Sequence, residues 1–174
     1  MADSALGRNR LPVFLPENFE ELESRLMLAV RISRLGKDIA RKFAGRYYDA
    51  LAVAMVTEAK EPSRRDALSL VADNACVTGE WAEIRPEGGD IAYGVTVTAF
   101  TSPLRESRIL ETKSASITGL KEKIDTARAE ISKGVTFKTG DMLLIETGIN
   151  FAPRPDINLE AKIGDRQSLK IHFK

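Results

Sequence analysis

The stretch Tyr47–Thr57 constrains the fold most, because apolar side chains occupy both its odd and its even positions. Successive residues of a β-strand point to opposite faces of its sheet, so this pattern predicts a strand that is buried on both sides. Upstream, every second residue from Leu26 to Ile32 is apolar and large, which predicts another strand beginning at Arg25. A helix is the alternative there, because a second apolar set has helical spacing: Phe19, Leu22, Leu26 and Val30.

Alternation and turn residues elsewhere predict a strand-rich chain with two helices. Extended pieces are expected over Leu11–Pro16, Ala75–Ile84, Ile91–Thr101, Arg108–Glu111 and two segments with Gly-Asp turns, TGDMLLIET and IGDRQSLKIHF. An apolar stripe at helical spacing predicts a helix over Ile117–Gly134, and a shorter helix is expected over Asp38–Gly45. Loops are expected over Glu58–Arg65 and around Asn150–Ile157, and residues 1–10 are expected to be loose. The class is therefore α+β and β-rich, with one domain over residues 1–174.

The composition favours an ordinary globular protein and excludes several functional classes. The 174 residues include 26 basic and 25 acidic side chains, so no charge excess favours nucleic acid or a membrane surface. The single cysteine, Cys76, excludes an internal disulfide, and the N-terminal residues lack the apolar stretch of a signal peptide. We therefore expect a cytoplasmic protein. The lone histidine, His172, has no companions for a zinc site or a Cys-His pair.

Three segments, taken in order, resemble the fumarylacetoacetate hydrolase family. They are LPENFEELESRLMLAVRI, GKDIARKFAGRYYDALAVAM and ISKGVTFKTGDMLLIETG, and together with their spacing they extend the resemblance over about Leu15 to Ile171. The resemblance implies a mixed β-roll or sandwich of that family's C-terminal domain type, assembled as a homodimer. It also implies chemistry on small 2-oxo acids, with a Mg²⁺-type metal held by two glutamates and an aspartate.

The positions that match the family's metal ligands carry different residues here. The two glutamate positions carry Arg25 and Met27, and the aspartate position carries Met55. A guanidinium repels a cation, and a thioether is too soft a ligand to replace a carboxylate for Mg²⁺. The family's lysine position carries Arg65, which keeps a positive charge but cannot act as a base. Thr147 and Gly148 match a turn that lines the family's cleft.

Each of these residues has a plainer interpretation beside the functional one. Arg25 and Arg65 are candidates for clamping a small carboxylate ligand, whereas Arg25 could instead pair with Glu21 or Glu23. The favoured role for Met27 and Met55 is an apolar plug in the vacated metal pocket, since methionine fills irregular gaps. Thr147 and Gly148 are expected at the cleft or, more simply, at a tight bend.

The leading functional prediction is a ligand-binding or non-catalytic protein of this type, with no catalytic residues, metal or cofactor and with a homodimeric assembly. The alternative is a hydrolase, isomerase or decarboxylase of a small 2-oxo acid that uses Mg²⁺ or Mn²⁺ in a rearranged site. A third interpretation is a small β-rich interaction domain whose resemblance to the family is coincidental.

Overall fold

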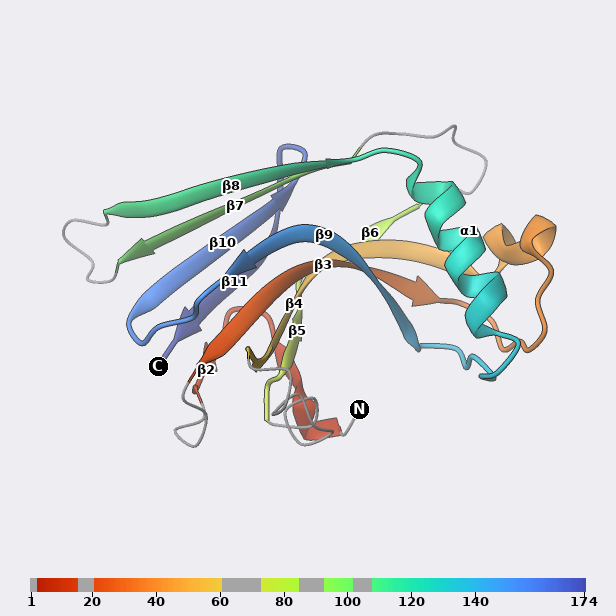
Figure 1. The fold of residues 1–174 in the computed structure, drawn as a ribbon, viewed down its shortest axis with the longest axis horizontal. Helices are drawn as coiled ribbons and strands as arrows, with labels where there is room; N and C mark the ends of the chain where they lie inside the picture. Colours follow the sequence, from red (N-terminus) through yellow and green to blue (C-terminus); the bar gives the residue numbers. More distant parts are fainter. Residues whose placement is uncertain (1–2, 16–20, 61–72, 85–92, 102–107) are drawn as a thin grey trace.

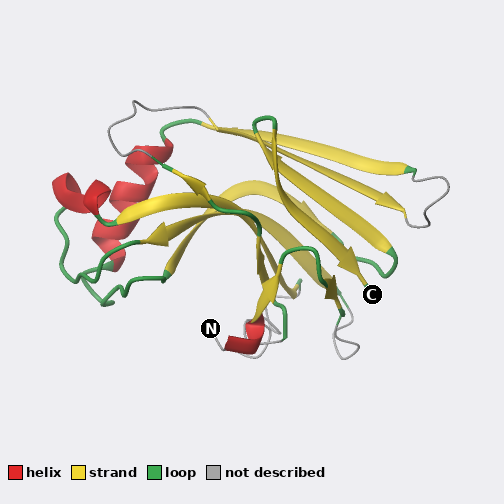
Figure 2. Ribbon diagram, turned by 180° about the vertical axis from the view of Figure 1, so that it is seen from behind, coloured by secondary structure: helices red, strands yellow, loops and turns green. Residues whose placement is uncertain are grey.

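Two β-sheets packed face to face form the body of the molecule, and a helix packs at one end (Figure 1). The computed structural model describes residues 3–15, 21–60, 73–84, 93–101 and 108–174. The view from behind shows the main helix and one short helical turn at one end, a second short turn beside the N-terminus, and strands at the opposite end (Figure 2). Within the described ranges, no helix is long and apolar enough to cross a membrane.

The larger sheet, called sheet A, has the strand order β1-β5-β4-β3-β9, with β6 beside β4. Sheet B has the order β2-β11-β10-β7-β8. The bounds in sheet A are β1 Leu6–Arg8, β3 Leu22–Ile32, β4 Tyr48–Ala59, β5 Cys76–Thr78, β6 Ala82–Glu83 and β9 Met142–Phe151. Those in sheet B are β2 Pro12–Val13, β7 Tyr93–Thr101, β8 Ile109–Ile117, β10 Ile157–Ile163 and β11 Arg166–Phe173. The helices are α1 Leu120–Ile131 and two 3₁₀ turns, η1 Asp3–Ala5 and η2 Arg41–Arg46.

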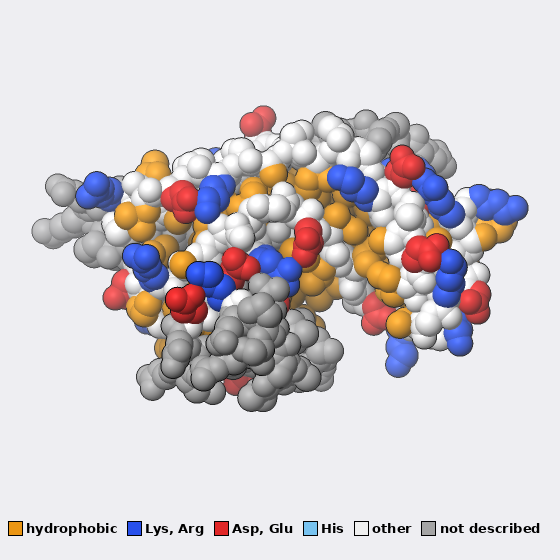
Figure 3. Space-filling model, in the orientation of Figure 1, with side chains coloured by type: hydrophobic (Ala, Val, Ile, Leu, Met, Phe, Trp, Pro, Cys, Tyr) orange, Lys and Arg blue, Asp and Glu red, His pale blue; other side chains and the backbone are white. Residues whose placement is uncertain are grey.

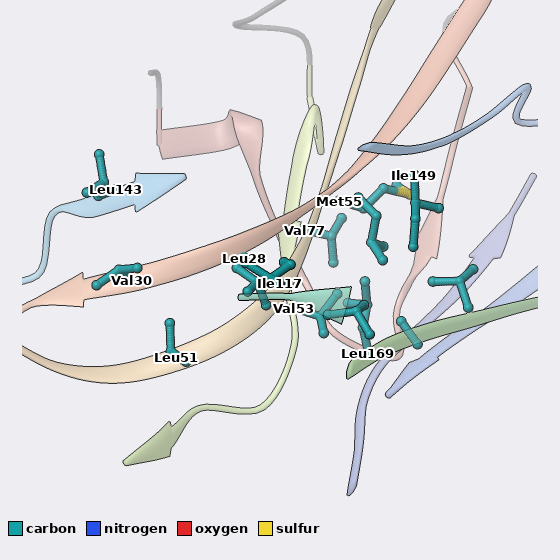
Figure 4. Packing of buried hydrophobic residues seen from close by; sticks show 14 of the residues in the cluster. Leu28, Val30, Leu51, Val53, Met55, Val77, Ile117, Leu143, Ile149 and Leu169 are labelled. Carbon is teal, nitrogen blue, oxygen red and sulfur yellow. The ribbon is translucent and has the colours of Figure 1, made fainter. Parts of the chain in front are cut away.

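Strand β4 is the centre of sheet A and is buried on both faces, as the sequence predicts. One face meets sheet B in the main core, where Met55 lies in the same cluster as Val77 and Ile149 (Figure 4). The other face joins a smaller cluster with Met27 and Cys76. The predicted β-rich α+β class is therefore confirmed, and so is a strand rather than a helix over Arg25–Ile32.

Several predicted boundaries are wrong for local physical reasons. The short strand expected at Arg108–Glu111 continues to Ile117, and Gly119 at φ 62° turns the chain into α1. The expected strand Ala75–Ile84 is divided into β5 and β6. Residues 6–8, within the segment expected to be loose, form β1 and pair in parallel with β5. The short helix is a 3₁₀ turn over Arg41–Arg46, and the first two residues of the strand expected over Ile91–Thr101 lie outside the described residues.

Arg128 on α1 is a fully buried cation without a hydrogen-bond partner in the described part of the chain. The rings of Tyr47 and Phe137 lie 4.4 and 5.0 Å from its guanidinium carbon, within cation–π distance. Burial lowers the pKa of Arg128, while Tyr47, Asp125 and Tyr48 oppose that shift. The two rings thus offset part of the cost of burying a charge.

We expect Arg128→Met to leave the free energy of unfolding unchanged or to raise it by about 1 kcal/mol, because a buried unpaired cation is replaced by an apolar chain of similar length. Arg128→Ala should lower it by about 2 kcal/mol, because a cavity remains between the two rings. Urea unfolding of both variants measures the difference. A larger loss for the methionine variant than for the alanine variant would mean that the ring contacts outweigh the desolvation cost.

Candidate functional site

The residues that match the family's metal ligands start on β3, where alternate side chains face away from sheet B. Arg25 pairs with Val56 of β4, and Met27 pairs with Ala54, so these four side chains share that outer face of sheet A. Leu26 and the next alternate residues of β3 point to the main core instead. The space-filling view shows a hollow under the arch of β3 and β9, with hydrophobic side chains in it and charged ones beside it (Figure 3).

The guanidinium of Arg25 joins two carboxylates from the neighbouring strands. Nη2 lies 2.8 Å from Oε1 of Glu58 on β4, and Nη1 donates to Oε1 of Glu146 on β9, also at 2.8 Å. The Glu58 side chain is only 4% exposed, whereas that of Glu146 is 68% exposed. Because a shielded ion pair is screened less by water, the charge of Glu58 acts on Arg25 with less screening than that of Glu146.

Hydrogen bonds extend this charged group along β9. The Asn150 amide donates from Nδ2 to Oε1 of Glu23 at 3.1 Å, and Asn150 is the register partner of Arg25. Glu23 in turn lies opposite Glu58 in the β3–β4 ladder. Lys113 of β8 donates to the Asn150 carbonyl at 2.7 Å and so ties sheet B to this part of sheet A. This row of polar side chains contains Glu58, Arg25 and Glu146 across three strands, with Glu23 and Asn150 beside them.

Thr147 and Gly148 form a two-residue bulge in β9 beside this row. Leu26 pairs with Ile149 while Met27 pairs with Glu146, so the two residues between them have no partner in the ladder. Gly148 has φ +77°, a left-handed conformation that favours glycine. The Thr147 hydroxyl donates to the Leu26 carbonyl at 2.6 Å and accepts from the Ile149 amide at 3.2 Å. These contacts fit the simpler prediction of a tight bend.

The structure separates the two methionines that the sequence assigns to one vacated pocket. Met27 is on the outer face of sheet A, whereas Met55 is opposite Leu26 and belongs to the main core. The expectation that both side chains fill one pocket is therefore wrong. Ala54, the residue before Met55, is the one that lies opposite Met27, and its methyl group offers no ligand atom.

The partners of Arg25 also differ from those expected. Glu21 binds Lys60 at 3.0 Å, and the contacts of Arg25 are with Glu58 and Glu146 rather than with Glu21 or Glu23. Glu58 was expected to begin a loop, but β4 continues through it to Ala59. Arg65 lies outside the described residues. The alternation of β4 continues for two positions beyond Val56 and reaches Glu58. This continuation is the sequence signal that could have identified Glu58 as a strand residue beside Arg25.

The chemistry of this face does not fit a Mg²⁺-type metal at the matched positions. Arg25 and Met27 provide no oxygen ligand, and such ions require several. The floor beside them is apolar, with Ala29, Cys76, Leu144 and Trp81 around Met27. Among the described residues, no three His, Cys, Asp or Glu side chains are arranged to hold a metal ion. The arrangement can hold an internal cation, the Arg25 guanidinium, between carboxylates.

Comparison with known proteins gives the class of fold. No family model matches the sequence, and no curated protein matches it either. Solved structures match over 98% of the chain: 5-carboxymethyl-2-hydroxymuconate delta-isomerase from Mycobacterium smegmatis (15% identity, TM-score 0.76) and maleylpyruvate hydrolase from Sphingobium (15%, 0.76). A fumarylacetoacetate hydrolase family protein from Yersinia pestis matches with 18% identity and a TM-score of 0.75.

The chain therefore has the fumarylacetoacetate hydrolase-like fold, as its sequence resemblance implies. The interpretation of that resemblance as coincidence is wrong, because the likeness extends over nearly the whole chain. The chain spans 65% of the length of the isomerase, 62% of that of the hydrolase and 82% of that of the Yersinia protein. At sequence identities of 15–18%, the structural likeness establishes the fold alone.

Burial raises the pKa of the Cys76 thiol to about 11. We expect the folded protein to react with a thiol reagent at pH 8 far more slowly than the unfolded chain, because the thiolate is the reactive form. The raised pKa also contributes stability that is complete below the unfolded value of about 8.5 and is lost as the pH rises towards 11. Absorbance after adding Ellman's reagent, with and without guanidinium chloride, measures the reaction. Rapid reaction of the folded protein would contradict this expectation.

We expect Arg25→Met to lower the free energy of unfolding by about 2 kcal/mol, because the shielded Glu58 carboxylate loses its cation. Arg25→Met combined with Glu58→Met should recover most of that loss, because an apolar pair replaces the ion pair. The matched control is Arg41→Met, which breaks the exposed contact of Arg41 with Glu122 and should cost about 0.5 kcal/mol or less. Equal losses in Arg25→Met and Arg41→Met would contradict the special role of the Glu58 contact.

Proposed function

We propose that this chain is a non-catalytic fumarylacetoacetate hydrolase-like protein in which an internal cation has replaced the bound metal. The observation that carries the proposal is the contact of the Arg25 guanidinium, at 2.8 Å, with both Glu58 and Glu146. Arg25 stands where the resemblance expects a carboxylate ligand. Its permanent positive charge interacts with both carboxylates, as a bound divalent cation would.

The same arrangement limits how the hollow could bind a ligand. The expected ligand is a small carboxylate, and a guanidinium binds a carboxylate best through two parallel hydrogen bonds. Both terminal nitrogens of Arg25 already contact carboxylates. A ligand would therefore displace the exposed Glu146 and leave Glu58 in place, and the apolar surface around Met27 would contact the rest of the molecule.

The alternative is a metal-dependent enzyme with a rearranged site, and one observation favours it. Glu58 and Glu146 both contact the Arg25 guanidinium, so two carboxylates lie around one side chain on the outer face of sheet A, and Glu23 lies opposite Glu58 in the ladder. If the Arg25 side chain moved away, oxygen ligands of the kind preferred by Mg²⁺ or Mn²⁺ would remain. The reaction class would be hydrolysis, isomerisation or decarboxylation of a small 2-oxo acid, as the resemblance implies.

The remaining proposals rest on the resemblance and the composition. We propose a homodimer in the cytoplasm, because family members form homodimers and because the sequence has a single cysteine and no charge excess. Light scattering of the purified protein tests the assembly.

Thermal unfolding in the presence of metal separates the two functional proposals. We expect millimolar Mg²⁺ or Mn²⁺ with oxalate or pyruvate to leave the Tm of metal-depleted protein unchanged, because ligands stabilise only the states that bind them. A marked rise in Tm would overturn the non-catalytic proposal and support the enzyme.

The matched variant is Arg25→Glu combined with Met27→Glu, which returns carboxylates to both positions. We expect Mn²⁺ to raise the Tm of this variant but not that of the natural protein. If Mn²⁺ raised the Tm of neither the variant nor the natural protein, the residues at positions 25 and 27 would not explain the proposed loss of metal binding.

A further inference from the structure

A second cavity opens between the two sheets, at the end of the molecule opposite α1. It has a volume of about 390 Å³, which lies within the range of small-molecule sites of roughly 300–1,000 Å³. Its floor consists of core-facing side chains of sheet B, including Ala99, Leu159 and Phe173. Phe151 of β9 and Leu110 of β8 form its sides. The cavity lies where β8 and β9, the edge strands of their sheets, meet the loop that follows β9.

The cavity interior is apolar, and charged groups lie at its mouth. Arg154 and Glu111 are the ionisable residues in its lining. Glu111 forms an ion pair with Lys113 at 3.0 Å, and Lys113 lies 5.2 Å from the centre of the Phe151 ring. Arg154 is exposed and forms no ion pair in the described part of the chain. The mouth therefore combines an unpaired cation with an apolar interior.

We propose that this cavity binds an amphipathic monocarboxylate, such as a medium-chain fatty acid. The aliphatic chain would lie against Ala99, Leu159 and Phe173, where it removes apolar surface from water. The carboxylate would lie at the mouth and pair with Arg154, which has the fork geometry that carboxylates prefer. An amine of equal length would place a like charge beside Arg154, whereas the acidic group of the lining, Glu111, is already paired with Lys113.

This site is separate from the proposed function on the outer face of sheet A. Phe151 pairs with Ser24 and faces the cavity side of β9, whereas Asn150 pairs with Arg25 and faces the other side. Loss of fatty-acid binding therefore leaves the Arg25 contacts with Glu58 and Glu146 intact. A failure of one proposal does not imply the failure of the other.

The test is a titration of the full chain with sodium octanoate, octanol and octylamine, followed by calorimetry and by ¹⁵N NMR shifts. Octanoate should bind most tightly and shift the amides of Phe151 and Ile157. Arg154→Gln should weaken octanoate binding about fivefold to tenfold and leave octanol binding unchanged. Arg166→Gln, an exposed arginine outside the cavity lining, is the matched control and should change neither.

A second variant tests the contact between the cavity and the aliphatic chain of the ligand. Leu110 is 48% exposed, so Leu110→Ser should fold and should weaken both octanoate and octanol binding. No binding of octanoate at millimolar concentration would overturn the proposal, and so would equal binding of octylamine. Unchanged affinity in both Arg154→Gln and Leu110→Ser would also overturn it. A homodimer in which a second copy covers the mouth of the cavity would also overturn the proposal.

Discussion

The antiparallel pairing of β3 with β4 is the constraint on which the rest of the structure depends. The ladder runs from Leu22–Ala59 to Ile32–Tyr48, and it places the two most apolar strands at the centre of sheet A. One face of this pair closes the main core against sheet B, and the other carries Arg25 and Met27. A shift of the register by one residue would exchange these two faces, so core packing and the candidate site are specified together.

A single interaction on that pair distinguishes this chain chemically. The Arg25–Glu58 contact joins β3 to β4 across the outer face, and the contact with Glu146 extends it to β9. In the proposed function, the Arg25 guanidinium supplies the positive charge that a bound ion would otherwise bring to this face. A guanidinium cannot act as a Lewis acid, so the proposal separates the fold from the metal chemistry.

The sequence predicts the strands well, because their alternation is local, and it predicts the site less well. Which face of β4 meets Arg25 depends on the register with β3, and that register is set by contacts distant in sequence. For this reason the sequence predicts one pocket for Met27 and Met55, which lie in different clusters, and it predicts a loop at Glu58 although the alternation reaches it. For Thr147 and Gly148 the sequence predicts a turn at the cleft or a tight bend rather than a bulge, since nothing local shows that two residues lack partners.

The number of residues in that bulge has a consequence of its own. Two extra residues are an even number, so β9 keeps the same faces on both sides of the bulge: Ile145 and Ile149 turn inward, whereas Glu146 and Asn150 turn outward. Removing one residue would reverse the far half of the strand and turn Asn150 into the core, while removing both would leave every face as it is. Because the number of inserted residues is even, the whole of β9 keeps one face towards the main core and the other face towards Arg25.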